Sequence, residues 1–302
     1  MDYKAEIKKL AKEKDAIILA HNYQIDDIQD VADIVGDSLG LSIDASRVKN
    51  KVIVFCGVHF MAETAHMLAP DKTVLLPNMD AGCPMADMIT GDKLREFKKE
   101  HPGATTVCYV NSTADVKSES DLCCTSGNAV NVIKSIETDK IIFVPDKNLG
   151  HYVSQFTDKE VILYPGFCPI HNRLTPIQVE KLMDKYPEAE FVAHPECPPA
   201  VVEMAHHVCS TSGLYTYCKN SDKKQFIIGT EEGVGYKLRL ENPDKEFIFA
   251  YDGFTCKNMK KTSLKDVYEC LLNMDNVITV DKEVAKKAVT CIERMLAIPR
   301  NE

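Results

Sequence analysis

The stretch AIILAHNYQIDDIQDVADIVGDS, residues 16–38, decides the fold class of this chain. It begins with a short apolar run, passes through a polar triplet, and continues with apolar residues at helical spacing. Bounded apolar runs of this length are typical of strands that helices cover on both faces. We therefore expect a strand over 16–21 and a helix over 26–35, which together form the building block of a parallel α/β sheet.

The same alternation of apolar runs and helical segments recurs along the chain. One helix is expected over 59–68, where Pro70 ends it, and another over 284–296, after a capping residue at Asp281. Further strands are expected over 51–57, 73–78, 105–111, 140–145, 160–166, 190–195, 226–230 and 247–253.

Comparison of these segments reveals an internal repeat with three copies. In each copy a strand ends in a polar triplet: His21-Asn22-Tyr23, Tyr109-Val110-Asn111 and His194-Pro195-Glu196. A hydroxyl residue stands seventeen residues after the first member of each triplet, and a cysteine stands 62, 59 and 62 residues after it. The hydroxyl residues are Ser38, Ser126 and Thr211, and the cysteines are Cys83, Cys168 and Cys256.

The repeat predicts three similar α/β/α three-layer domains with parallel sheets. We place them at residues 1–85, 86–170 and 171–257, with the C-terminal segment 258–302 packing back on the first. Ligands of parallel sheets bind beyond the carboxyl ends of the strands, where all these landmarks lie. If the domains surround a pseudo-threefold axis, the landmarks meet in one central cavity.

Composition and charge exclude several classes of function. The chain has 36 Lys and Arg against 45 Asp and Glu, a net charge of −9, and the charges are interspersed, so nucleic acid is not an expected partner. The N-terminal apolar run is too short for a signal peptide, and no stretch approaches the roughly 18 apolar residues of a membrane span. We therefore expect a cytoplasmic protein with no membrane partner.

Three of the twelve cysteines, Cys83, Cys168 and Cys256, occupy matched places in the repeat. No CxxC occurs, so the ligands of any metal come from distant segments. Three thiolates on one axis form a tripod, which leaves one iron of a 4Fe-4S cluster open for water or substrate. A three-cysteine zinc site and ordinary buried thiols are the alternatives, and iron content with oxygen sensitivity distinguishes them.

The polar triplets supply hydrogen-bond donors and one carboxylate. Glu196 is the candidate general base, and Tyr23 or Tyr109 is its acid partner. His21, Asn111 and His194 complete the set.

Two further groups lie close to these landmarks. Ser38, Ser126 and Thr211 stand beside Gly or Asn at expected helix starts, where they either cap the helix or bind phosphate or carboxylate. His171 follows Cys168 by three residues and either supports the metal ligand or forms a cavity wall.

Eight segments of the sequence, given below, together resemble the quinolinate synthase family. The resemblance covers about residues 15 to 270 and implies three α/β/α domains around a 4Fe-4S cluster held by Cys83, Cys168 and Cys256. The segments that carry it are AHNYQIDDIQDVAD (20–33), VGDSLGLS (35–42), AGCPMADM (81–88), YVNSTADVKSESDLCCTSGNAV (109–130), GFCPIH (166–171), AHPECPP (193–199), CSTSG (209–213) and CKNMKKTSL (256–264).

The resemblance also implies a reaction: iminosuccinate condenses with dihydroxyacetone phosphate to quinolinate, with loss of phosphate and two waters, for NAD biosynthesis. The enzyme that supplies iminosuccinate is then an expected partner. Tyr23 and Glu196 would act in proton transfers. The substrate would be surrounded by His21, Ser38, Tyr109, Asn111, Ser126, His194, Glu196 and Thr211.

Other functions remain open at this point. Another open-iron hydro-lyase would act on a hydroxy acid and form no pyridine ring. A non-catalytic iron-sulfur sensor would carry a DNA-binding or partner-binding module, and no basic stripe is visible. A cluster-free binding protein would show no brown chromophore after anaerobic purification.

Overall fold

One sheet topology occurs three times in the computed structural model, which describes residues 1–301. Every sheet is parallel, and in each the first and third strands of the unit are neighbours at its centre. In spatial order the sheets are β2 (Ile34–Gly36), β1 (Ala16–His21), β3 (Val52–Cys56), β4 (Thr73–Leu75); β6 (Leu122–Cys124), β5 (Thr105–Tyr109), β7 (Lys140–Val144), β8 (Glu160–Leu163); and β10 (His207–Val208), β9 (Glu190–Ala193), β11 (Gln225–Gly229), β12 (Glu246–Phe249).

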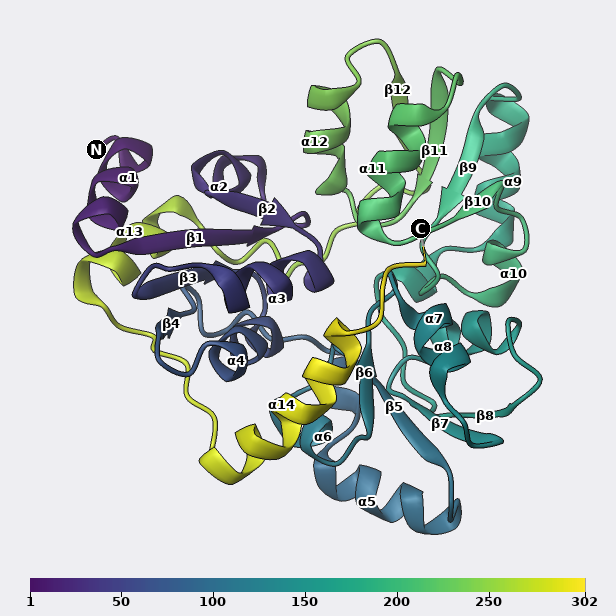
Figure 1. The fold of residues 1–302 in the computed structure, drawn as a ribbon. Coiled ribbons are helices and arrows are strands. Elements are labelled where there is room, and N and C mark those ends of the chain that lie inside the picture. Colours follow the sequence, from purple (N-terminus) through teal and green to yellow (C-terminus); the bar gives the residue numbers. More distant parts are fainter. Residues whose placement is uncertain (302) are drawn as a thin grey trace.

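Helices follow the strands in each unit and cover the sheet faces. Figure 1 shows the three units, coloured purple to blue, teal and green, around a common centre, which confirms the predicted α/β fold of three similar units. The helices are α1 (Tyr3–Glu13), α2 (Asp26–Val31), α3 (Ser38–Arg47), α4 (His59–Leu68), α5 (Gly91–Glu100), α6 (Ala114–Ser118), α7 (Ala129–Ser135), α8 (Lys147–Ser154), α9 (Pro176–Lys185), α10 (Pro199–Val202), α11 (Thr211–Asn220), α12 (Val234–Glu241), α13 (Leu264–Asn273) and α14 (Lys282–Leu296).

Every strand expected from an apolar run is present, but the short edge strands β2, β6 and β10 were not foreseen. The helix expected over 26–35 was wrong in its last part. Helix α2 stops at Val31, Ala32 has an extended backbone, and Val35 belongs to β2, where it pairs with Ala20 of β1. Pairing with a neighbouring strand therefore overrides the helical spacing of these apolar residues.

The cores of the units consist of the side chains of the central strands. Phe55, Phe143, Phe191 and Phe226 are almost wholly buried, one or two on each central pair of strands. Burial of such a ring contributes roughly 1.5–3 kcal/mol relative to exposure. The packed sheets therefore give a rigid base to the loops that follow the strands.

The C-terminal helices pack on two different units. Helix α13 lies against α1 and β3, whereas α14 lies mainly against α6 and β6 and also touches α4. Asp281 caps α14, as expected, by accepting the backbone N–H groups of Glu283 and Val284. In Figure 1 the chain after α14 runs toward the junction of the teal and green units.

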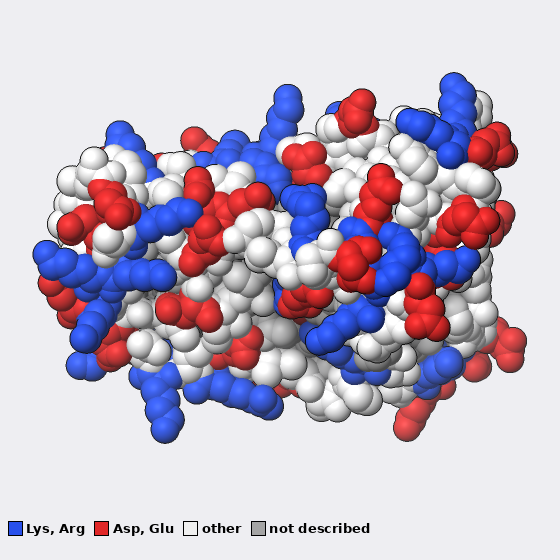
Figure 2. Space-filling model, turned by 90° about the horizontal axis from the view of Figure 1, so that it is seen from above, with Lys and Arg blue, Asp and Glu red and all other residues white. Residues whose placement is uncertain are grey.

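The surface carries charges of both signs. In Figure 2 lysines and arginines alternate with aspartates and glutamates across the face in view, without a continuous basic stripe on that face. Within residues 1–301, no helix has the length and apolar character needed to cross a bilayer.

Candidate active site

A central cavity lies where the three units meet. Its wall includes residues that follow strands in every unit, because the carboxyl ends of all three sheets face it. Every residue proposed above as a catalytic, substrate-binding or metal-binding group lines this one cavity: His21, Tyr23, Ser38, Cys83, Tyr109, Asn111, Ser126, Cys168, His171, His194, Glu196, Thr211 and Cys256.

Two histidines occupy the same place in the first and third units and are held in the same way. Nδ1 of His21 accepts the backbone N–H of Tyr23 at 3.1 Å, and Nδ1 of His194 accepts that of Glu196 at 3.3 Å. Both rings are buried, and burial lowers the pKa of His21 to about 4 and that of His194 to about 3. Each ring is therefore neutral near pH 7 and carries its proton on Nε2, which in His194 lies 3.2 Å from Oγ of Ser126.

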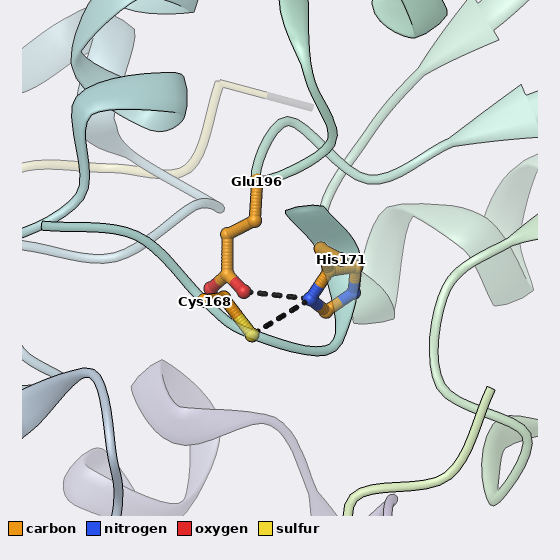
Figure 3. A group of neighbouring side chains, drawn as sticks. All are labelled: Cys168, His171 and Glu196. Carbon is orange, nitrogen blue, oxygen red and sulfur yellow. Dashed lines mark hydrogen bonds and ion pairs between the residues drawn. The ribbon is translucent and has the colours of Figure 1, made fainter. Parts of the chain in front are cut away.

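Glu196 is buried, only 4% exposed, and has two hydrogen-bond partners. Tyr109 donates its hydroxyl hydrogen to Oε1 at 2.5 Å, and Nδ1 of His171 lies 2.8 Å from Oε2. In Figure 3 the two dashed lines meet at Nδ1, one from Glu196 and one from Sγ of Cys168, which is 3.2 Å away. Burial opposes ionisation of Glu196, but His171, His194 and Tyr109 together outweigh it and hold its pKa well below the usual range.

The same chain of hydrogen bonds continues to a second tyrosine. Nε2 of His171 lies 2.9 Å from Oγ1 of Thr230, which in turn lies 2.9 Å from the hydroxyl of Tyr23. Burial, with the charge of Glu196, raises the pKa of both tyrosines well above the usual value, so both phenols stay protonated. This hydrogen-bond chain runs from Tyr109 through Glu196, His171 and Thr230 to Tyr23. It ends at Thr211, whose Oγ1 lies 3.2 Å from the hydroxyl of Tyr23.

The three loops that carry Cys83, Cys168 and Cys256 are fixed by one repeated hydrogen bond. In each unit, the backbone N–H three residues after the third strand donates to the carbonyl two residues before the cysteine, at 2.8 to 2.9 Å. The donor and acceptor pairs are His59 with Ala81, Lys147 with Gly166, and Glu232 with Phe254.

Two of these loops gain a second support from a buried carboxylate. Cys168 N–H donates to Asp146 at 3.2 Å, and Cys256 N–H donates to Glu231 at 3.0 Å. Asp146 and Glu231 stand at the same place in their units, two residues after the third strand, where the first unit has Val58. The support is therefore a feature of the second and third units.

The three matched cysteines differ from the other nine. They are partly exposed, whereas the other nine are buried. Cys83 interacts electrostatically with both Cys168 and Cys256, and burial raises the pKa of its thiol to about 12. All three line the cavity, and Cys168 also belongs to a group with His171 and Glu196 whose ligand atoms lie within 4.8 Å of one another and could hold a metal ion.

Two of the three hydroxyl residues stand at the first position of a helix. Ser38 begins α3 and Thr211 begins α11, while the caps are Asp37 and Ser210, so capping by Ser38 and Thr211 is wrong. Ser126 lies three residues before α7. The backbone N–H groups at these positions favour an anion.

Sequence reasoning missed several residues of the cavity and its hydrogen-bond chain. Asp37 and Glu231 line the wall, and Thr230 joins Tyr23 to His171. A signal existed for Glu231, because the turn IIGTEEGVG matches FVPDKNLG in the second unit, where Asp146 has the same place. No comparable signal marked Asp37.

Comparison with known proteins gives consistent results. Residues 5–297 match the family described as quinolinate synthetase A protein. The chain is 57% identical over 298 residues to the quinolinate synthase of Geobacter sp. (strain M21), covering 99% of this chain and 98% of the relative. It is 53% identical over 294 residues to that of Alkaliphilus metalliredigens (strain QYMF), covering 97% of both. The similarity therefore extends over nearly the whole of each chain.

Proposed function

The chain belongs to the quinolinate synthetase A family, and from this membership and the cavity we propose that it is a quinolinate synthase acting in the cytoplasm in NAD biosynthesis. Iminosuccinate and dihydroxyacetone phosphate are its substrates, and quinolinate, inorganic phosphate and two waters are its products. The observation that carries the proposal is the meeting of three unit-equivalent cysteines with the Tyr109–Glu196–His171 chain in one cavity.

We assign a 4Fe-4S cluster to Cys83, Cys168 and Cys256, on the basis of their matched loops and partial exposure. When bound, the cluster supplies a Lewis acid with an open iron position that polarises a substrate oxygen. The three units each give one ligand. The remaining cavity wall is then free to bind the organic substrates.

Glu196 is the general base in this proposal. Its carboxylate is ionised and buried, so it can take a proton from a substrate carbon next to a polarised oxygen. Tyr109, hydrogen-bonded to Glu196, holds the proton that returns to a leaving oxygen. Tyr23, at the other end of this hydrogen-bond chain, likewise holds a proton for a leaving oxygen and is connected to Glu196 through Thr230 and His171.

The neutral histidines and the hydroxyls bind and orient the substrates. His21 and His194 present Nε2–H groups without adding positive charge, so they suit carbonyl or carboxylate oxygens. The N–H groups near Ser38, Ser126 and Thr211 suit the phosphate group or a carboxylate. The position of the cavity between the three units would limit the access of water to the imine.

Purified, anaerobically reconstituted protein tests the proposal. With both substrates, it should form a pyridine dicarboxylate that mass spectrometry identifies, together with one phosphate per ring. Cys83→Ala, Cys168→Ala and Cys256→Ala should each lose iron and activity, whereas Cys270→Ala, a buried cysteine of α13, should keep both. Loss of water from a hydroxy acid without ring formation would favour a different hydro-lyase instead.

A further inference from the structure

The C-terminal residues 297–301, which we call the strap, are fastened to the second unit. The side chain of Asn128 donates to the carbonyl of Ile298, and that of Asn131 donates to the carbonyls of Pro299 and Arg300, at 2.9 to 3.3 Å. The backbone N–H of Asn301 donates to the carbonyl of Gly127 at 2.7 Å, and its side-chain oxygen accepts the backbone N–H of Asn131 at 3.0 Å. The end of the chain therefore has a fixed course along the loop that carries Ser126.

Arg300, a residue of the strap, contacts the first unit through its side chain. Its guanidinium forms a bidentate pair with Asp37, at 2.7 and 2.8 Å, and the two side chains are 29% and 9% exposed. Asp37 caps α3, whose first residue is Ser38, and it also lines the cavity. Bidentate arginine–carboxylate pairs fix the orientation of both groups, and partial burial limits screening of this pair by salt.

The same ion pair also touches the third unit and the loop of the second. Ser212, next to Thr211 in α11, contributes to lowering the pKa of Asp37, and Arg300 lines a surface groove with Ser212. A Cβ on Gly127 would lie 2.8 Å from Nη1 of Arg300, so the guanidinium would have to shift if another residue stood at this position. The side chain of Arg300 therefore lies close to residues of all three units.

Asp37, Gly127 and Ser212 are the sequence neighbours of three cavity residues, Ser38, Ser126 and Thr211, which we call the hydroxyl trio. Each belongs to a different unit, so their mutual placement depends on contacts between units. Burial opposes ionisation of Asp37, but the hydrogen bonds and charge of Arg300 outweigh it and lower its pKa. The pair is therefore charged at neutral pH.

We propose that Arg300 is a positioning residue that holds the hydroxyl trio together as one anion site. It acts through Asp37 on the start of α3 and through the strap on the loop of the second unit. The identity of the anion, the phosphate group of the triose phosphate, rests on the proposed function. The geometric role of Arg300 does not.

The test compares Arg300→Gln and Arg300→Lys with Arg294→Gln. Arg294 is a matched control because it lies on α14, is exposed, and donates only to the carbonyl of Asp121 among the described contacts. Arg300→Gln should raise the KM for dihydroxyacetone phosphate roughly tenfold, equivalent to the loss of one modest interaction. The kcat should change less than the KM, because no reacting group is removed, and Arg300→Lys should recover part of the loss.

A second measurement does not need turnover. In metal-free protein, inorganic phosphate should slow the alkylation of Cys83, Cys168 and Cys256 by iodoacetamide, as counted by mass spectrometry. The phosphate concentration for half-protection should rise roughly tenfold in Arg300→Gln and stay unchanged in Arg294→Gln. Melting temperatures within a few degrees of wild type ensure that the variants are folded.

The inference fails if phosphate does not protect wild-type protein, or if folded Arg300→Gln keeps the wild-type phosphate response and KM. If the phosphate response weakens as expected but wild-type protein makes no quinolinate, the positioning role stands and the proposed function fails.

Discussion

Tyr109 of the second unit and Glu196 of the third share a hydrogen bond of 2.5 Å across the central cavity. The carboxylate also faces His171, so both of its oxygens are occupied in a buried setting. The proposed proton transfers therefore depend on the contact between two units, not on either alone.

Replacing Glu196 by Gln removes the proposed base while keeping its size. We expect kcat to fall by roughly 10²–10⁴, the usual contribution of a positioned acid or base. Tyr109→Phe should fall within the same range, because it removes the hydrogen-bonded proton. Steady-state quinolinate formation measures both, with exposed Glu188→Gln as the control. Near-normal turnover in Glu196→Gln would eliminate Glu196 as the base.

Thr230→Val tests the link between Tyr23 and His171. Valine keeps the shape of threonine but breaks the hydrogen bonds of 2.9 Å to both groups. We expect kcat to drop by roughly tenfold or more, because one proton partner is disconnected. The variant should bind the same amount of iron as wild type. Thr216→Val, on an exposed part of α11, provides the control, and equal kcat values for the two variants would contradict the link.

Asp146→Ala should destabilise the metal-free protein. Asp146 accepts the N–H groups of Asn148 and Leu149 at the start of α8 and that of Cys168. Loss of these bonds should lower the free energy of unfolding by about 1–3 kcal/mol. Urea denaturation measures it, with exposed Asp158→Ala as the reference. Equal stability of the two variants would mean that Asp146 does not support this turn.

The stability of the metal-free protein should fall between pH 7 and pH 5.5. The pKa values of His21 and His194 are about 4 and about 3 in the folded protein, because both are buried. The unfolded chain takes up protons below about pH 6.5, while the folded protein does not, so acid favours unfolding. Each histidine should contribute about 1 kcal/mol to this fall. Urea titrations should show a shallower pH dependence in His21→Gln and His194→Gln, and an unchanged slope would contradict neutral buried rings.

The long central strands could be predicted from the sequence because each is a short, continuous apolar run bounded by polar or turn residues. Strand β3, for example, is buried at all five positions. The edge strand β10 has only two residues, so no period could reveal it, and in β2 the pairing of Val35 with Ala20 prevailed over helical spacing. Short edge strands form because a neighbour supplies their hydrogen bonds, which local sequence does not encode.

For the candidate site, sequence reasoning found the residues that repeat and missed those that do not. The spacing shared by the three copies of the repeat predicted positions such as Cys83 and Ser38, and both line the cavity. The contact between Asp37 and Arg300 joins residues 263 positions apart and occurs once. Its existence depends on where the strap crosses the units, which only the three-dimensional fold determines.

The threefold repetition of one sheet order also explains which positions could diverge. Cysteine stands at the equivalent place in all three copies, and a hydroxyl does so too, whereas the triplets read HNY, YVN and HPE. The proposed iron-sulfur cluster would suit identical ligands related by rotation, whereas an organic substrate without such symmetry would not. If the gene arose by triplication of an ancestral unit, the triplets are where asymmetry had to be introduced for the protein to distinguish one end of its substrate from the other.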